Sequence, residues 1–508
     1  MIFRAPEDPI TIPNVALTPF LLERATAWGD KPAFIDSSTG ETLTFRGWSD
    51  GVKRAAASLA RRGFKKGDVF AIYSPNCPGY AIAFHAVSLL GGIVTTINPL
   101  YTAEELSKQL DDAGASYLLT APPFLDKTAG LQLREIFVFG EAQGATSFES
   151  LLETDGEPPL VNIDPQNDVV AMPYSSGTTG LPKGVMLTHR NLVANILQCE
   201  PLVGVREEDV TLGVLPFFHI YGLVVIMNLS LRIGATVVTM PRFDLERCLS
   251  ALQKYRVTFG FIVPPIALAL ARSPVVANYD LTSLRTLFSG AAPLSAEVSQ
   301  AVATRLRCTF MQGYGLTETS PVTHVNRSGD GVGVGQPVPN TEAKIVDVVT
   351  GSELGPDQEG EICVRGPQVM KGYLNRPDAT AAMIDGDGWL HTGDIGSADA
   401  RGRLFVVDRL KELIKYKGMQ IAPAELEALL LTHPSVADAA VIPIADEEAG
   451  QVPKAFVVLR SEATPEDIQA FVASRVAPYK KLRYVEVTDV IPRSASGKIL
   501  RRVLAARV

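Results

Sequence analysis

The chain has 508 residues, with 47 lysines and arginines against 55 aspartates and glutamates, which gives a formal net charge of −8. This length exceeds what one hydrophobic core supports, so two or more domains are expected. The acidic balance disfavours a general nucleic-acid-binding protein, because such proteins are usually basic. Hydrophobic residues make up 46% of the chain and charged residues 20%, as is typical of an ordinary globular protein.

The cysteines and the chain ends indicate the compartment. The five cysteines show no Cys-x-x-Cys spacing and no clustering with histidine, which disfavours a disulfide scaffold and a structural zinc site. The N-terminus lacks a basic region followed by an apolar core. Arg232 and Pro264-Pro265 interrupt the longer apolar stretches before they reach the length of a membrane span. We therefore expect a cytoplasmic protein without stable membrane insertion.

Residues 1–165 alternate between strand and helix patterns, which predicts a largely parallel sheet covered by helices. Thr102 and Glu105 have capping-box spacing at the start of one helix. His85 lies in an apolar helix, and we interpret it as a core histidine. The expected elements are a hairpin of strands 33–36 and 43–45, helices 49–62 and 81–90, and strands 68–73 and 93–98.

A glycine-rich stretch, Ser175 to Gly184, follows the apolar run 168–174 and precedes a helix that Thr188 can cap. Its glycines let backbone N–H groups close on an anion, its hydroxyls add donors, and Lys183 adds a positive charge. This predicts a phosphate-binding loop. The spacing is not that of the common P-loop, because Lys183 precedes a glycine and no Ser or Thr follows it. The alternative is a flexible surface loop.

The composition of two further segments, 215–222 and 289–293, indicates a binding site for an organic ligand. His219 and Tyr221 stand among apolar residues in 215–222, which suits the lining of a cleft, although a turn with partly buried aromatics fits as well. After predicted strands at 236–240, 257–263 and 283–288, the small residues 289–293 would let a flat ligand approach a strand end.

Residues 308–319 combine a strand, a glycine-flanked aromatic, a hydroxyl and a carboxylate. Tyr314 could stack on a base, Thr317 could bond a phosphate, and Glu318 could hold Mg²⁺, which prefers oxygen ligands. The stretch 331–336 superficially resembles a dinucleotide fingerprint, but no strand precedes it and prolines follow, so we predict a loop.

From about residue 340 the pattern changes to short strands, at 343–348, 360–365 and 404–407, which suggests a small β-rich unit. Within it, Asp394 is expected to present an exposed carboxylate. A charged joint at 408–412 precedes a final unit with two lysine–glycine loops. In that unit we expect helices 423–431 and 464–476, strands 437–442 and 454–459, and loops 415–420 and 494–499.

Together these motifs resemble the adenylate-forming superfamily, and within it the AMP-forming acyl-CoA synthetases, with most similarity to 4-coumarate–CoA ligases. The motifs occur in order over almost the whole chain, at 175–184, 215–222, 289–293, 312–318, 360–366, 392–394, 408–427 and 496–498. The resemblance implies an α/β fold. A large N-terminal domain, 1–409, would contain two α/β lobes and a distorted β-barrel, and a small mobile α+β domain, 410–508, would turn at a hinge near Lys411.

The resemblance also implies an activity in two steps. ATP and a carboxylic acid would form an acyl-adenylate and pyrophosphate, and the thiol of CoA would then displace AMP to give a thioester. The acid would be an aryl-propenoic acid of the 4-coumarate or cinnamate type, with Mg²⁺ as the metal. The implied partners are therefore the acid, ATP and CoA, without nucleic acid. The sequence leaves the oligomeric state open.

The resemblance also implies site residues, at the positions of this chain that match the family's motifs. Those matching the ATP/AMP site are Ser175, Ser176, Gly177, Thr178, Thr179, Gly180, Lys183, Gly290, Ala291, Ala292, Pro293, Gln312, Gly313, Tyr314, Gly315, Thr317, Asp394 and Arg409. Those matching the acid pocket are His219, Tyr221, Phe288, Gly313, Pro321 and Val322. Glu318 would bind Mg²⁺. Lys498 would bridge acid and phosphate, Lys415 and Gln420 would act at the thioester step, and Lys417 and Gly418 would contact CoA.

One departure bears on the substrate. Plant 4-coumarate–CoA ligases commonly have a lysine where this chain has Phe288, which favours a less polar acid. Open alternatives are a medium-chain fatty acyl-CoA ligase, a ligase that loads a carrier protein, and luciferase-like oxygenation. Outside this chemistry, the competitor is a glycine-rich-loop NTPase, disfavoured because the chain lacks a Walker A lysine. A non-enzymatic scaffold would have no use for Lys498.

Overall fold

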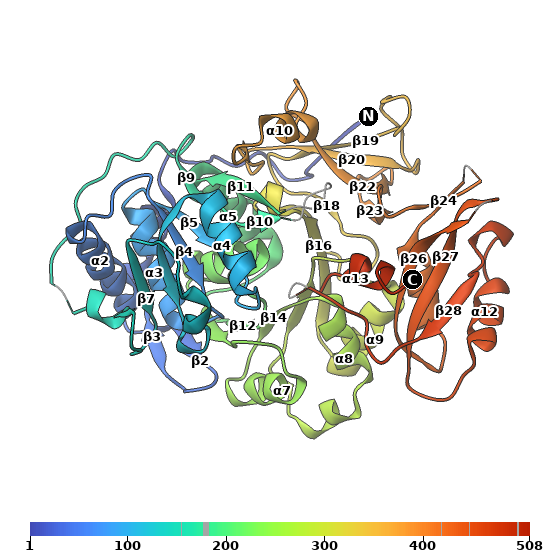
Figure 1. Ribbon diagram of the computed structural model, residues 1–508, viewed down its shortest axis with the longest axis horizontal. Helices are drawn as coiled ribbons and strands as arrows, with labels where there is room; N and C mark the ends of the chain where they lie inside the picture. The colour runs from blue at the N-terminus through green and yellow to red at the C-terminus, as the bar shows by residue number, and fades with distance from the viewer. Residues whose placement is uncertain (154, 176–181, 418, 447, 495–496) are drawn as a thin grey trace.

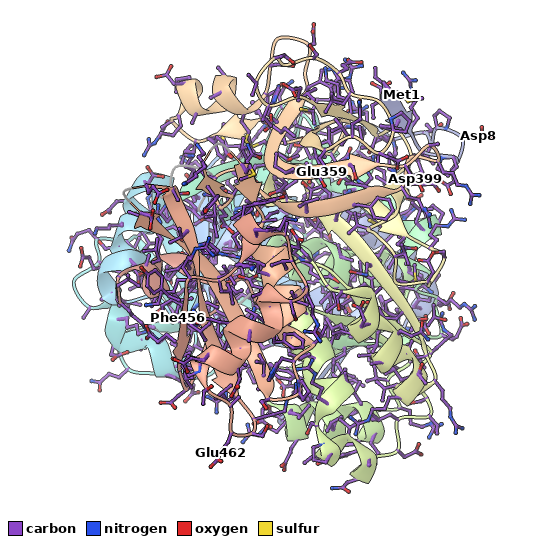
Figure 2. All side chains as sticks on the ribbon, turned by 90° about the vertical axis from the view of Figure 1, so that its right-hand side faces the viewer. Met1, Asp8, Glu359, Asp399, Phe456 and Glu462 are labelled. Atoms are coloured by element: carbon purple, nitrogen blue, oxygen red, sulfur yellow. The ribbon has the colours of Figure 1, made fainter. Side chains whose placement is uncertain are left out.

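The computed structural model describes residues 1–153, 155–175, 182–417, 419–446, 448–494 and 497–508. A large N-terminal body lies beside a smaller C-terminal domain, drawn in red at the right of Figure 1. Figure 2 turns this domain toward the viewer, with Phe456 and Glu462 labelled on it. The main hydrophobic cluster draws its residues from Phe3 to Leu404, and a separate one from Ile414 to Leu482. These separate cores fit the expected two-domain architecture, whereas the boundary at residue 409 stays a prediction.

The first lobe is a sheet whose strand order is β10-β11-β9-β5-β4-β6-β7-β8, with β21 beside β11. Its centre, β9-β5-β4-β6-β7-β8, is parallel, as the alternating pattern predicted. The strands are β4 Val69–Tyr73, β5 Ile93–Thr96, β6 Ala115–Thr120, β7 Glu135–Val138, β8 Thr146–Ser147, β9 Val169–Ala171, β10 Tyr174–Ser175, β11 Lys183–Thr188 and β21 Gly372–Tyr373. The helices are α2 Phe45–Arg61, α3 Pro78–Leu89, α4 Ala103–Ala113, η1 Pro122–Thr128 and η2 Glu149–Leu151.

Two local predictions for this lobe are confirmed. Thr102 and Glu105 form the capping box at the start of α4, each accepting a hydrogen bond from the other's backbone N–H. His85 is fully buried on α3, where its Nδ1 lies 3.0 Å from the Thr18 hydroxyl. Burial lowers the pKa of His85 to about 3, so it is a neutral core residue.

The end of the glycine-rich stretch forms a strand that the sequence did not predict. Lys183 to Thr188 form β11, which pairs antiparallel with β10. The predicted cap is confirmed, because Thr188 caps α5 and Asn191 completes the capping box. Val185 and Leu187, two residues apart, are both fully buried, the period-two pattern of a strand. Lys183 thus begins a strand and is itself buried.

The second lobe has the strand order β18-β17-β16-β15-β14-β12-β13-β2-β3. Strands β16 to β2 are parallel, and the predicted hairpin β2–β3 closes one edge. The strands are β2 Pro32–Asp36, β3 Thr42–Thr44, β12 Val210–Gly213, β13 Thr236–Thr239, β14 Phe259–Ile262, β15 Thr286–Ser289, β16 Thr309–Gly315, β17 Val322–Asn326 and β18 Gln336–Pro337. The helices are α1 Leu17–Trp28, α5 His189–Val203, η3 Tyr221–Asn228, α6 Leu229–Ile233, α7 Leu245–Lys254, α8 Pro264–Arg272, η4 Pro274–Asn278, α9 Ala296–Leu306 and η5 Thr317–Thr319.

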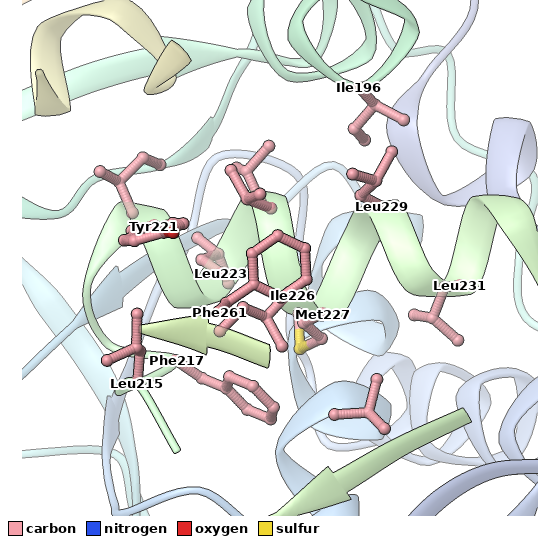
Figure 3. Close-up of a cluster of buried hydrophobic side chains, with 14 of the residues drawn as sticks. Ile196, Leu215, Phe217, Tyr221, Leu223, Ile226, Met227, Leu229, Leu231 and Phe261 are labelled. Atoms are coloured by element: carbon pink, nitrogen blue, oxygen red, sulfur yellow. The ribbon is translucent and has the colours of Figure 1, made fainter. Parts of the chain in front are cut away.

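A buried π-helix, η3, follows the segment that contains His219. All eight of its residues are buried, and Leu223 and Ile226 lie in the apolar cluster drawn with Phe261 in Figure 3. Gly222 is required at its start, because a Cβ there would lie 2.1 Å from the carbonyl oxygen of Pro216. This packing fixes the backbone that carries His219 and Tyr221.

The β-rich unit is an antiparallel sheet with the linear order β1-β19-β20-β22-β23. Within the described residues it does not close, so the structure has an open sheet where a distorted β-barrel was expected. Its elements are β1 Ile2–Arg4, β19 Glu342–Val346, β20 Gly360–Arg365, α10 Pro377–Met383, β22 Leu390–Ala398 and β23 Leu404–Arg409.

The C-terminal domain contains a sheet of order β25-β24-β27-β26 with β28 beside β27. Its predicted helix 423–431 is confirmed residue for residue. Nowhere in the described chain is a helix both long and apolar enough to cross a bilayer. The domain's elements are β24 Ile414–Tyr416, β25 Met419–Ile421, α11 Pro423–Leu431, β26 Val436–Asp446, β27 Gly450–Leu459, α12 Pro465–Ala473, η6 Pro478–Lys480, β28 Tyr484–Val487 and α13 Arg501–Ala505.

A buried asparagine ties the two lobes together beside the His219 segment. The amide of Asn76 donates to the carbonyls of Gly213 and Leu215, at 2.9 and 2.8 Å. Its oxygen accepts the N–H of Phe217 at 2.7 Å. Asn76 therefore pairs three backbone groups, of which the carbonyl of Gly213 also accepts the N–H of Met240 at 3.1 Å.

We expect Asn76→Ala to lower stability by roughly 1–3 kcal/mol for each backbone group left unpaired. Urea unfolding followed by tryptophan fluorescence measures the loss. Asn162→Ala, at an exposed position, is the matched control and should unfold like the wild type. An Asn76→Ala midpoint equal to that of the control would contradict this role.

Candidate active site

A pocket lies at the carboxyl ends of β15 and β16 in the second lobe, between the His219 segment and one lysine of the C-terminal domain. Ligands of open α/β sheets bind at such strand ends. Its lining comprises His219, Ile220, Tyr221, Phe288, Gly290, Ala291, Gly313, Tyr314, Gly315, Leu316, Thr317, Pro321, Val322 and Lys498. All six residues expected for the acid pocket are among them.

The apolar wall of the pocket is formed by Phe288. Its ring packs 6.0 Å from that of Phe261, centroid to centroid. Gly313 lies on the neighbouring strand, where a Cβ would come within 2.6 Å of the Phe288 ring and 3.2 Å of the carbonyl oxygen of His324. Residue 313 must therefore be a glycine for the Phe288 ring to occupy this position. The wall suits the flat, apolar part of a ligand.

His219 presents a neutral donor. Its Nδ1 accepts the N–H of Tyr221 at 3.3 Å. Burial, with a smaller effect of the nearby Lys498 charge, lowers the pKa of His219 to about 3. The ring is thus neutral with its proton on Nε2. Tyr221 is fixed in turn, because its hydroxyl donates to the carbonyl of Phe288 at 3.1 Å.

Asp394 joins Tyr314 and Arg409 in a polar cluster. Its Oδ2 accepts the Tyr314 hydroxyl at 2.7 Å, and its Oδ1 lies 3.3 Å from Nε of Arg409. Asp394 and Arg409 face each other in the register of β22 and β23. The expectation of an exposed carboxylate is wrong, because Asp394 is only 6% exposed beneath these neighbours. Burial raises the pKa of Asp394, against the opposing charge of Arg409.

Glu318, on η5, forms a second buried cluster with Ser175 and Tyr373. Its Oε1 accepts hydroxyls from Ser175 at 2.7 Å and Tyr373 at 2.8 Å. The ammonium of Lys183 lies 4.9 Å from the centre of the Tyr373 ring, within cation–π distance. Tyr373 was not among the residues predicted from the sequence, because a tyrosine after a glycine carries no chemical signal. The pairing of β21 with β11 brings it to the site.

Lys498 reaches the pocket from the C-terminal domain. Its backbone N–H donates to the Ser494 hydroxyl at 3.1 Å, and its carbonyl accepts the N–H of Ser494. Gly497 has φ +82°, and a Cβ on it would meet Val263 at 3.2 Å, so glycine permits this approach. Burial and Arg409 lower the pKa of Lys498 to about 8, against the carboxylates of Asp394 and Glu318.

The second lysine loop points elsewhere. Lys415 and Gln420 face each other across the hairpin β24–β25 at the edge of the C-terminal sheet, and both are exposed. Lys417 forms an ion pair with Glu448 at 2.5 Å. Gly418 lies outside the described residues. The lining of the pocket contains none of the three described residues.

Several expected nucleotide residues are not brought into the lining. The amide of Gln312 donates instead to the carbonyl of Gly331 at 3.0 Å. Ala292 and Pro293 lie in the loop after β15, beyond the lining residues. Residues 176–180 of the glycine-rich loop lie outside the described residues. Their roles stay predictions.

Known proteins were compared with the chain and its fold. The model of the AMP-binding enzyme family matches residues 21–374, and that of the AMP-binding enzyme C-terminal domain matches residues 425–498. The chain is 45% identical to a 4-coumarate–CoA ligase of Pinus taeda, over 97% of this chain and 95% of the relative. It is also 45% identical to 4-coumarate–CoA ligase 1 of Petroselinum crispum, over 100% and 97%.

Two solved structures extend this similarity. The anthranilate CoA ligase AuaEII in complex with anthranoyl-AMP superposes with a TM-score of 0.90 at 26% identity, over 98% of both chains. The ATP-bound MatB of Rhodopseudomonas palustris superposes with a TM-score of 0.87 at 28% identity, over 97% of this chain and 99% of that one.

We expect Lys498 to lose its proton near pH 8 rather than near the ordinary lysine value of about 10.4, because burial and Arg409 disfavour its charged form. Labelling the ligand-free protein with an amine-acylating reagent across pH, with mass spectrometry of the Lys498 peptide, measures this midpoint. Asp394→Asn removes a carboxylate that raises the pKa, so the midpoint should fall further. A wild-type midpoint near 10 would contradict the buried environment.

Proposed function

The chain belongs to the AMP-binding enzyme family, and we propose that it is an ATP-dependent carboxylic acid–CoA ligase that acts on aryl-propenoic acids through an acyl-adenylate. The observation that carries this proposal is the position of Lys498. This lysine of the C-terminal domain lines the same pocket as the residues expected to bind the acid. The negative charges of Asp394 and Glu318 are close enough to raise its pKa.

The nucleotide would be held by the two polar clusters. Asp394 and Arg409 would bind the ribose hydroxyls, with Tyr314 orienting Asp394 and packing beside the adenine. Lys183 and the glycine-rich loop would hold the β- and γ-phosphates. Glu318 fits Mg²⁺, because a buried carboxylate oriented by two hydroxyls is a hard oxygen ligand. When bound, the ion neutralises phosphate charge.

In the first step an oxygen of the substrate carboxylate attacks the α-phosphorus of ATP, and the bond to the departing pyrophosphate breaks. Negative charge gathers on the α-phosphate oxygens, where preorganised donors and cations are most effective. Lys498 would supply a cation between the acid and the phosphate. The Nε2–H of His219 adds a neutral donor, and Thr317 would bind the α-phosphate.

In the second step the sulfur of CoA attacks the acyl carbonyl, loses its proton to solvent, and AMP leaves. Lys415 and Gln420 would act here, so their hairpin must reach the pocket. Turning about Lys411 would break contacts between the domains, among them two hydrogen bonds. The guanidinium of Arg272 donates to the carbonyl of Leu431 at 2.7 Å, and the N–H of Ala424 donates to Asp408 at 2.8 Å.

An aryl-propenoic acid suits the pocket because its far wall is aromatic. Phe288 lies against Phe261, and the ring of Tyr221 lies beside Gly290. Flat rings pack well in such surroundings. The relatives named 4-coumarate–CoA ligases support the same acid class, while Phe288 favours acids without a polar ring substituent.

Product analysis tests the proposal. With Mg²⁺, ATP, CoA and cinnamate, we expect equal amounts of AMP, pyrophosphate and cinnamoyl-CoA. Release of ADP and orthophosphate independent of any acid would contradict the proposal and favour a glycine-rich-loop NTPase.

We expect Lys498→Ala to slow pyrophosphate release in a single turnover by roughly 10²–10³, the scale for loss of one preorganised donor. It should spare thioester formation from supplied cinnamoyl-AMP. Lys415→Ala should do the reverse, because each lysine serves one orientation of the domain. Lys254→Ala, exposed on α7, should match the wild type in both assays. Equal losses in both steps for both active-site variants would exclude alternation.

We expect kcat/KM for cinnamate to be at least that for 4-coumarate, because Phe288 offers no partner to the phenol hydroxyl. Steady-state assays of the two acids with the wild-type enzyme measure the ratio. An apolar pocket distinguishes a hydroxylated analogue only weakly, by about 10² or less. A preference above a hundredfold for 4-coumarate would show that the ring hydroxyl has a hydrogen-bonding partner.

A further inference from the structure

A cysteine, a histidine and a glutamate meet on one face of the β-rich sheet. Cys363 on β20 and His391 on β22 are directly opposite in the antiparallel register, so their side chains share a face. Glu361 is two residues before Cys363 on the same strand and shares that face. Figure 1 shows β20 and β22 side by side.

The three side chains converge on one ring nitrogen. Nδ1 of His391 lies 2.9 Å from Oε2 of Glu361 and 3.4 Å from Sγ of Cys363. One ligand atom of each lies within 4.8 Å of the other two. Adjacent ligands of a tetrahedral Zn²⁺ are about 3.4–3.6 Å apart, given Zn–S near 2.3 Å and Zn–N and Zn–O near 2.1 Å. To reach that geometry the two distances from Nδ1 must lengthen slightly, while the distance between Glu361 and Cys363, at most 4.8 Å, must lie near the same value.

The other ring nitrogen faces a carboxylate that lies just beyond hydrogen-bond distance. Nε2 of His391 lies 3.6 Å from Oδ2 of Asp385. Histidine ligands almost always donate their second N–H to a carboxylate or carbonyl, which fixes the ring and its tautomer. The Oδ1 of Asp385 accepts the N–H groups of Asp387 and Trp389, so the carboxylate is itself held in place.

Charge and access also suit a divalent cation. With the thiol ionised, Cys363, Glu361 and Asp385 supply three negative charges, and Lys344, opposite Cys363 on β19, supplies one positive charge. A doubly charged ion balances this set. Burial raises the pKa of the Cys363 thiol to about 12, so binding must release its proton to solvent. Some 33% of the His391 side chain is exposed, which gives an ion a path.

We propose that Glu361, Cys363 and His391 form a binding site for Zn²⁺ or a similar thiophilic divalent ion, with a fourth position open to water. This metal site is distinct from Glu318, whose oxygen chemistry suits Mg²⁺.

Cobalt and zinc titrations of the metal-stripped, full-length protein without nucleotide test the site. We expect one Co²⁺ per chain with a thiolate-to-cobalt charge-transfer absorption, and one Zn²⁺ that displaces it, measured against a chromogenic chelator. Cys363→Ser should abolish the absorption and weaken zinc binding tenfold or more. Cys248 is buried on α7 of the second lobe, away from the β-rich unit, so Cys248→Ser should change neither the absorption nor zinc binding.

Variants at two partly exposed positions, His391 and Asp385, test the site independently in case the Cys363 variant misfolds. His391→Gln should lose the absorption with an unchanged circular dichroism spectrum. Asp385→Asn keeps the acceptor for the two backbone N–H groups, so it should retain the absorption with about 10–100-fold weaker binding. Absence of stoichiometric binding in the wild type, or absorption that persists in Cys363→Ser, would overturn the proposal and leave the cluster a hydrogen-bonded network.

Discussion

A lysine ammonium held in the pocket between two domains is the constraint on which the arrangement of this molecule depends. Lys498 belongs to the C-terminal domain but lines a pocket of the N-terminal lobe. Removing its charge from water is unfavourable, as the lowered pKa of about 8 shows. Asp394 and Glu318 offset part of this cost. The phosphates of a bound nucleotide would offset more, so binding of ATP would favour the domain orientation seen here.

Under the proposed function, the same constraint would account for the two lysine loops of the C-terminal domain. Lys498 occupies the pocket while Lys415 stands exposed on an edge hairpin. The contacts that hold this orientation include hydrogen bonds of Arg272 and Asp408 and a small apolar cluster at the joint, formed by Ile395, Leu413 and Ala422. Interfaces of this kind between domains permit relative motion. A two-step reaction that needs two sets of donors at one pocket can therefore use a single small domain.

Much of the fold could be predicted because local signals and packing agree. The capping box at Thr102 and the helix 423–431 follow from residue types at fixed spacings. The residues from His219 to Val322 that family motifs selected line one pocket, and their role toward the acid stays a prediction. Long-range contacts decided the rest. The burial of Asp394 depends on its register with Arg409, and the role of Tyr373 on the pairing of β21 with β11. Likewise, Cys363 and His391 are 28 positions apart in sequence and meet only through sheet pairing.

The central claim is that an acyl-adenylate forms in this pocket before CoA takes part. Isotope exchange between labelled pyrophosphate and ATP measures that step directly, because the label enters ATP only if the first reaction reverses on the enzyme. With Mg²⁺ and cinnamate but without CoA, we predict exchange that requires the acid. Exchange that proceeds equally without acid, or that needs CoA to appear, would contradict the account.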